Sequence, residues 1–109
     1  MTKIDLIRLI GDVLTEVDTQ IGNLLPNDTR QRQLQDLRLL LDDRQRRLSG
    51  QVFDDNTRSF QAAAEELQGI NTDIRRTIAD VARIQDTINN VTRFLGSLTN
   101  LASTVGAVV

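Results

Sequence analysis

The sequence predicts an all-α fold: an antiparallel helical hairpin plus one long C-terminal helix, forming a three-helix bundle with coiled-coil-like heptad packing. Apolar residues recur along the chain at alternating spacings of three and four, which is the periodicity of packed helices. A single proline interrupts this pattern, and all aromatic residues are phenylalanine. Since 109 residues can bury one hydrophobic core but not two ordinary ones, we expect residues 1–109 to form one domain.

The first helix is expected over about residues 3–25. Thr2 and Asp5 have the spacing of a capping box, in which each side chain accepts a hydrogen bond from the other residue's backbone N–H. The sequence LLPND ends the helix, because Pro26 has no N–H to donate and disfavours helical geometry in the residue before it. The apolar stripe of this helix consists of Ile7, Ile10, Leu14, Val17, Ile21 and Leu24.

The second helix is expected over about residues 29–48. Asp28, followed three residues later by Gln31, has the pattern of a helix N-terminus. Gly50 offers a left-handed cap at the other end. The short connection to the first helix predicts an antiparallel pair, and the stripe consists of Leu34, Leu37, Leu41 and Leu48.

The third helix is expected over about residues 57–105, without a proline. Four candidate N-caps precede it: Asp54, Asp55, Asn56 and Thr57. Its stripe keeps the alternation of three and four without a slip and has one polar member, Thr77. The stripe consists of Phe60, Ala63, Leu67, Ile70, Ile74, Thr77, Val81, Ile84, Ile88, Val91, Leu95, Leu98, Ala102 and Val105.

Length distinguishes this helix from the first two. At 1.5 Å per residue it would extend about 70 Å, against about 30 Å for each of the others. The half beyond Val81 would then have no partner within its own chain. If the helix instead bends back on itself, Asn89, Asn90 and Gly96 are the expected positions of the bend.

The apolar surface broadens in this distal half. Phe94, Leu101 and Val108 each precede a stripe position, whereas the equivalent positions earlier in the helix include the acids Glu66, Asp73 and Asp80. A wider apolar arc indicates more than one partner helix. We therefore predict a non-enzymatic protein that self-associates, with a dimer as the simplest closed form, or docks to a helical partner. The predicted interaction face consists of Ile84, Ile88, Val91, Phe94, Leu95, Leu98, Leu101 and Val105.

A membrane-active or lipid-surface-binding protein that uses the same apolar C-terminal face is the alternative function. Residues 94–109 have no charged side chain, but they are fewer than the roughly 20 residues that span a bilayer. Helices that lie on membranes usually have Lys or Arg on the polar face and often Trp, and only Arg93 is close by. A disordered end is the third interpretation, although the continuing periodicity favours a helix.

Catalytic and metal-binding residue types are scarce. No histidine, cysteine or tyrosine occurs, which removes the usual general base and the commonest metal ligands. Adjacent acids such as Glu65 and Glu66 diverge by about 100° on a helix and do not converge on one atom. The run from Asp54 to Asn56 lacks the spacing and closing Glu of a calcium loop. We expect no enzyme activity, no cofactor and no metal.

The second helix holds six of the basic residues, Arg30, Arg32, Arg38, Arg44, Arg46 and Arg47. Acids are interleaved with them, this helix has no aromatic residue to stack on bases, and the net charge of the chain is −2. We therefore expect no nucleic-acid binding. Arg44 lies on the stripe between Leu41 and Leu48, and we expect it to pair with Glu65 or Glu66 of the third helix.

The N-terminal sequence MTKIDLIRLIGDV has acids within its apolar part, unlike a signal peptide. Together with the lack of cysteine and of a membrane-spanning segment, this favours a cytoplasmic location. Export by a leaderless secretion system would leave the same pattern and stays open.

Overall fold

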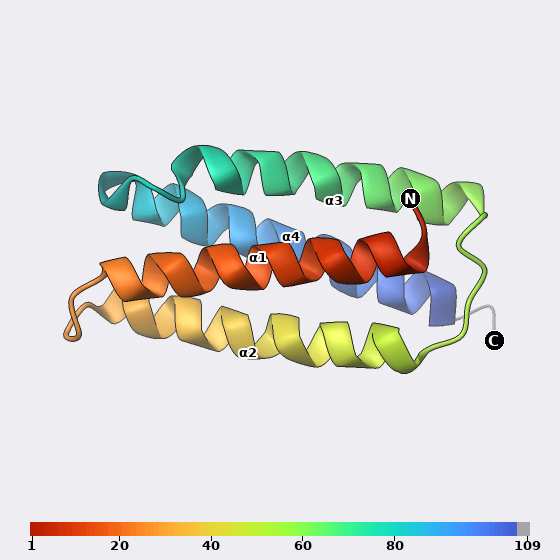
Figure 1. Ribbon diagram of the computed structural model, residues 1–109, viewed down its shortest axis with the longest axis horizontal. Helices are drawn as coiled ribbons and strands as arrows, with labels where there is room; N and C mark the ends of the chain where they lie inside the picture. The colour runs from red at the N-terminus through yellow and green to blue at the C-terminus, as the bar shows by residue number, and fades with distance from the viewer. Residues whose placement is uncertain (107–109) are drawn as a thin grey trace.

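The computed structural model describes the backbone of residues 1–106 and the side chains of residues 1–104. It contains the α-helices α1 (Lys3–Asn23), α2 (Thr29–Gly50), α3 (Arg58–Thr77) and α4 (Ile84–Gly106), and a short 3-10 helix, η1 (Val81–Arg83). Figure 1 shows their arrangement. No strand occurs in this part of the chain, so the all-α prediction is confirmed for the described residues.

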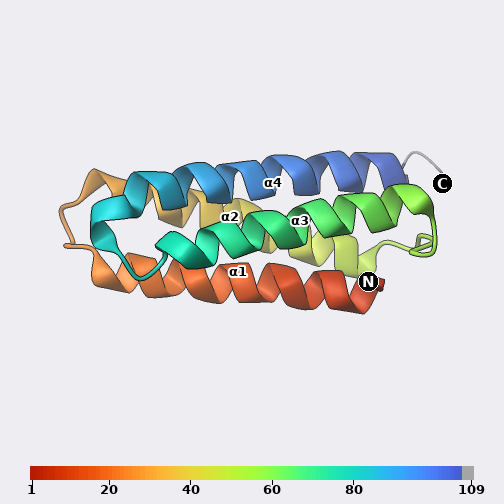
Figure 2. The ribbon, with the colours of Figure 1, turned by 90° about the horizontal axis from the view of Figure 1, so that it is seen from above.

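The helices form two antiparallel hairpins, α1 with α2 and α3 with α4, which lie side by side (Figures 1 and 2). α1 runs parallel to α3, and α2 runs parallel to α4. The contact between α3 and α4 is the most extensive, and that between α1 and α3 is the least extensive of the four lateral contacts. The order around the bundle is therefore α1, α2, α4, α3, with α2 and α3 at opposite corners.

The starts of α1 and α2 follow the local sequence as expected. The backbone N–H of Asp5 donates to Thr2 Oγ1 at 3.2 Å, and that of Thr2 donates to Asp5 Oδ2 at 2.9 Å, which confirms the capping box. Asp28 accepts from the backbone N–H of Arg30 at 2.9 Å. Both helices are thus started by the side chains that the sequence indicated.

The connection between α2 and α3 differs from the expectation at one glycine. α2 includes Gly50 and ends through Gln51, which is extended (φ −92°, ψ 134°). No described glycine has a positive φ, so the predicted left-handed cap is not used. Thr57 is the N-cap of α3 and accepts from the backbone N–H of Phe60 at 3.2 Å.

The structure corrects the predicted single helix over residues 57–105. α3 ends at Thr77, and α4 begins at Ile84 and runs back along α3 (Figure 2). Ile78 keeps helical backbone angles (φ −63°, ψ −29°), whereas Asp80 is extended (φ −114°, ψ 103°). The Asp80 side chain then accepts from the backbone N–H of Ala82 at 3.0 Å. The reversal is therefore a short, capped turn.

Burial of the distal apolar side chains explains why the chain turns back. Six of them are at most 7% exposed, and each contributes roughly 1.5–3 kcal/mol on full burial. Interrupting a helix forfeits a few backbone hydrogen bonds of about 1 kcal/mol each. Burial is the larger effect, so the turn forms although neither Gly nor Pro marks it. The expected bend positions Asn89, Asn90 and Gly96 lie inside α4.

All four helices contribute to one hydrophobic core. Phe60 of α3 and Phe94 of α4 are the largest of its fully buried side chains. The described chain is thus a four-helix bundle rather than the expected three-helix one, and the distal half has its partners within the same chain.

The predicted pairing of Arg44 with the acids of the third helix is also corrected. α2 packs against α1 and α4 rather than α3, which keeps Arg44 away from Glu65 and Glu66. Glu66 accepts a hydrogen bond from Ser97 Oγ at 3.2 Å instead. The heptad pattern alone does not specify which helices become neighbours.

Candidate interaction face

The predicted interaction face lies along α4 and is covered by the chain's own helices. Leu95 is partly buried against the core, and the side chain of Val105 lies outside the described residues. The remaining members are between 0 and 7% exposed: Ile84, Ile88, Val91, Phe94, Leu98 and Leu101. We call these six residues together with Leu95 the α4 face.

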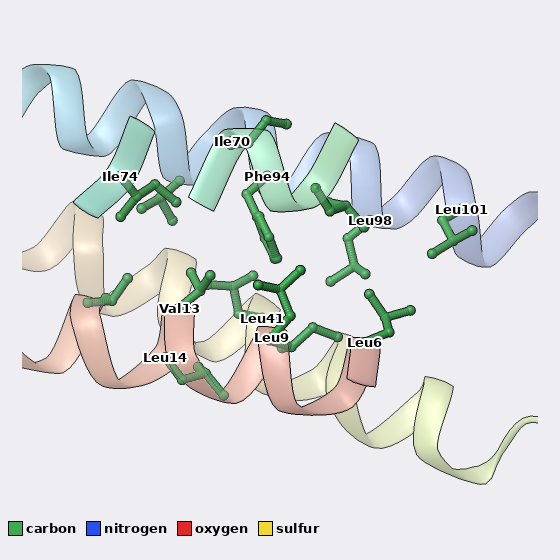
Figure 3. Packing of buried hydrophobic residues seen from close by; sticks show 14 of the residues in the cluster. Leu6, Leu9, Val13, Leu14, Leu41, Ile70, Ile74, Phe94, Leu98 and Leu101 are labelled. Carbon is green, nitrogen blue, oxygen red and sulfur yellow. The ribbon is translucent and has the colours of Figure 1, made fainter. Parts of the chain in front are cut away.

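The α4 face fills the centre of the bundle. Figure 3 shows Phe94 and Leu98 pointing from α4 across the bundle toward Leu6 and Leu9 of α1, with Leu41 of α2 nearby. α4 also packs directly against α2 and α3. The broad apolar arc read from the sequence therefore has several partner helices, and all of them belong to the same chain.

Three polar contacts fix the position of α4 along α3. They are Thr87 Oγ1 to Thr77 Oγ1 at 2.7 Å, Arg93 to Asp73 at 3.6 Å, and Ser97 Oγ to Glu66 Oε1 at 3.2 Å. The threonine pair is buried, and Thr77 in turn donates to the backbone carbonyl of Ile74 at 3.2 Å. The one polar member of the third stripe therefore serves to set the antiparallel register.

The contact between α1 and α3 is polar in part, and each of these helices buries a polar side chain that lacks hydrogen-bond partners. Arg75 Nε lies 2.8 Å from Glu16 Oε1, and Asp12 is 4.0 Å from the same guanidinium. Gln20 is 0% exposed and both of its amide atoms lack a hydrogen-bond partner among the described residues, as does Asn71 Oδ1. Each such buried group costs about 1–3 kcal/mol.

Two carboxyl groups show opposite electrostatic environments. Burial raises the pKa of Glu16, and its hydrogen bond from Arg75 opposes only part of this effect. Hydrogen bonds from the side chain and backbone N–H of Arg30 lower the pKa of Asp28 to about 2. The fold therefore disfavours the ionised form of Glu16 between α1 and α3, and favours that of Asp28 at the start of α2.

Sequence reasoning missed Gln20 and Asn71 as core residues. The buried residues of α1 are Leu6, Leu9, Ile10, Val13, Leu14, Val17 and Gln20, so the buried face keeps part of the predicted stripe and extends to its flank. Asn71 similarly follows Ala64 and Leu67 at spacings of three and four before Ile74. Their spacing from the buried apolar residues could have identified them as core positions, but a pattern of apolar residues leaves polar residues out.

The remaining described surface offers little for other chemistry. The hollow between α1 and α3 is lined by charged and polar side chains that include Asp5, Arg8 and Asp12. Within the described residues, no three acidic groups gather where they could hold a metal ion. None of the described helices has a stretch that is both long and apolar enough to cross a membrane.

Comparisons of the chain with protein-family models, with curated proteins and with solved structures found no match.

Proposed function

We propose that this protein is a non-enzymatic helical assembly protein that pairs with a second copy of itself by exchanging helices. In the closed bundle the α4 face packs in a core shared with α1 and α2 of the same chain. In the exchanged dimer the same side chains make the same contacts with α1 and α2 of the second copy. Exchange of identical elements requires no new complementary surface.

One observation supports this proposal most directly: the apolar stripe continues in register through the turn between α3 and α4. Ile74, Thr77, Val81, Ile84 and Ile88 keep the alternation of three and four, although Val81 is 40% exposed in the closed bundle. A turn that only reverses the chain needs no heptad position within it. The unbroken pattern is typical of coiled-coil-like packing along a longer helix.

Protein concentration decides between the two forms. A short connection holds a tethered element near its partners at an effective concentration in the millimolar range. The closed monomer therefore dominates in dilute solution, and the dimer gains by mass action as concentration rises. Any preference for one longer helix over the α3–α4 turn lowers the protein concentration at which the dimer forms.

Light scattering tests the proposal over a concentration series that reaches about 1 mM. The protein is unfolded and refolded at each concentration, so that exchange is not limited by slow opening. We expect the 12.2 kDa chain at low concentration and twice that mass at high concentration. Refolding of ¹⁵N-labelled with unlabelled protein should give mixed dimers in native mass spectrometry.

Two results would count against self-association. A mass of one chain at every concentration would contradict it directly. Flotation of the intact protein with phosphatidylcholine–phosphatidylserine vesicles, lost on deletion of residues 93–109, would favour the lipid-surface alternative. Under our proposal the bundle keeps the α4 face away from lipid and remains with the unbound fraction.

A further inference from the structure

We propose that α4 alone is exchanged and that the turn between α3 and α4 is the hinge. In the dimer, α3, η1 and α4 then form one continuous helix, and each α4 occupies the place of the other copy's α4. This inference rests on the proposed self-association and specifies how it occurs. Three connections compete for the role of hinge: residues 24–28, 51–57 and 78–83.

The first connection is fixed by its own sequence. Pro26 prevents a continuous helix through it. Asp28 holds Arg30 through its backbone N–H at 2.9 Å and through its guanidinium at 2.6 Å. Gln31 Nε2 also donates to the last turn of α1, at the carbonyl of Ile21, over 3.2 Å. A continuous helix through residues 24–28 would break these contacts and would still be interrupted by Pro26.

The second connection is fastened to the start of α1. The backbone N–H of Lys3 donates to Asp55 Oδ2 at 2.7 Å. The Lys3 ammonium group donates to the carbonyl of Ser49 at 3.1 Å and lies 5.5 Å from the ring centre of Phe53. Gln61 Nε2 donates to the Asp55 carbonyl at 2.7 Å. Exchange of the whole α3–α4 hairpin would have to disrupt this set of contacts.

The third connection makes only local hydrogen bonds, although Ile78 at its start packs against the core. Within the described residues, the hydrogen bonds of the segment 78–83 all stay between residues 74 and 86. Ala79, Asp80, Val81, Ala82 and Arg83 are all exposed. Straightening it therefore breaks no hydrogen bond with α1 or α2, and it places Val81 back on the apolar stripe.

The buried pair of Thr77 and Thr87 sets how the two long helices align in the exchanged dimer. In a continuous helix Thr77 and Thr87 are ten residues apart, or about 15 Å along the axis, so their hydrogen bond cannot persist within one chain. With two continuous helices antiparallel about a twofold axis, Thr77 faces Thr87 of the second copy. The contacts that align α4 with α3 are then all recovered between chains.

Two engineered cysteine pairs distinguish the hinges in the full-length chain, which has no native cysteine. Glu66→Cys with Ser97→Cys bridges α3 and α4, and Glu16→Cys with Arg75→Cys bridges α1 and α3. Monomer and dimer fractions of each variant are separated by gel filtration, treated with a short bismaleimide cross-linker, and run on denaturing gels. The monomer fraction is the matched control, in which both pairs should link within one chain.

In the dimer fraction we expect the 66/97 pair to give a covalent dimer and the 16/75 pair to give a covalent monomer. The reverse pattern would overturn the inference in favour of exchange at one of the other two connections, residues 24–28 or 51–57, while the proposed association stands. Covalent monomers from both pairs would indicate surface association without exchange and would also overturn it. If no variant yields a dimer fraction, the proposed function itself fails.

Discussion

The two hairpins of the bundle are closed by turns of different kinds. Between α1 and α2, Pro26 ends one helix, and the paired Asp28 and Arg30 begin the next. Between α3 and α4 there is neither Pro nor Gly, and the Asp80 side chain supplies one cap to the backbone of Ala82. The first hairpin is specified locally, whereas the second depends on what its helices pack against.

Under the proposed exchange, the second hairpin changes shape when its packing partners come from a second copy. The α4 face would then make the same contacts with an identical chain as it makes with its own. The first hairpin has no such freedom, because Pro26 in its turn excludes a continuous helix. Substitutions in one hairpin, with the other left unchanged as the comparison, test this difference.

The largest effect is expected from Phe94→Ala, which opens a cavity where α4 meets the rest of the core. Phe94 is 0% exposed, and such truncations cost about 3–5 kcal/mol of unfolding free energy. Chemical denaturation followed by circular dichroism measures it. Leu39→Ala, at a side chain of α2 that is 65% exposed, should stay within about 0.5 kcal/mol of the parent. Equal losses for the two variants would contradict the burial of α4.

Gln20→Leu should stabilise the bundle by about 2 kcal/mol, because it removes two buried polar atoms without hydrogen-bond partners. The midpoint of urea unfolding should rise accordingly. Gln35→Leu, at an exposed position of α2, is the control and should leave the midpoint nearly unchanged. A lower midpoint for Gln20→Leu would mean that its amide is satisfied in the folded protein.

Single changes in the two turns should separate stability from association. Pro26→Ala should lower the unfolding free energy by about 0.4–1 kcal/mol through the unfolded chain and leave the dimer fraction unchanged. Asp80→Ala should cost the closed bundle a similar amount, about 1 kcal/mol for a lost cap, and should raise the dimer fraction. Sedimentation equilibrium measures the dimer fraction of both variants. An unchanged dimer fraction in both would mean that the two turns do not differ in their effect on association.

The smallest effects are expected from pH. The depressed pKa of Asp28, about 2, means that its ionised form stabilises the fold above its ordinary pKa of 3.8, and this contribution is lost as pH falls through about 2. The raised pKa of Glu16 acts in the opposite sense, so its contribution improves as pH falls from neutrality toward 4.5. Unfolding free energies of Asp28→Asn and Glu16→Gln, measured against the parent across pH 2–7, should diverge in these opposite directions.

Much of the fold was predictable because it follows from local chemistry. The capping box at Thr2, the break at Pro26 and the cap at Asp28 each depend on residues within a few positions of one another. The return after Thr77 was not predictable in this way, since it comes from the summed burial of side chains against α1 and α2. The candidate face was recognisable from the sequence as an apolar stripe, but the helices that cover it could be identified only from the arrangement of all four helices.

The central claim is that the α3–α4 turn can become helix, and Val81→Pro tests it most directly. In the closed bundle Val81 begins η1 after the extended Asp80, where proline is tolerated. Arg58→Pro, which begins α3 after the extended Thr57, is the matched control. In a continuous helix the proline introduced by Val81→Pro would instead interrupt the interior, at a cost of about 3 kcal/mol per chain.

We predict that Val81→Pro leaves the unfolding free energy of the monomer within about 1 kcal/mol of the parent. Its dimerisation constant should fall by about 10⁴-fold, since both chains of the dimer carry the proline penalty, while Arg58→Pro dimerises like the parent. Dimerisation of Val81→Pro with the parent constant would contradict the account.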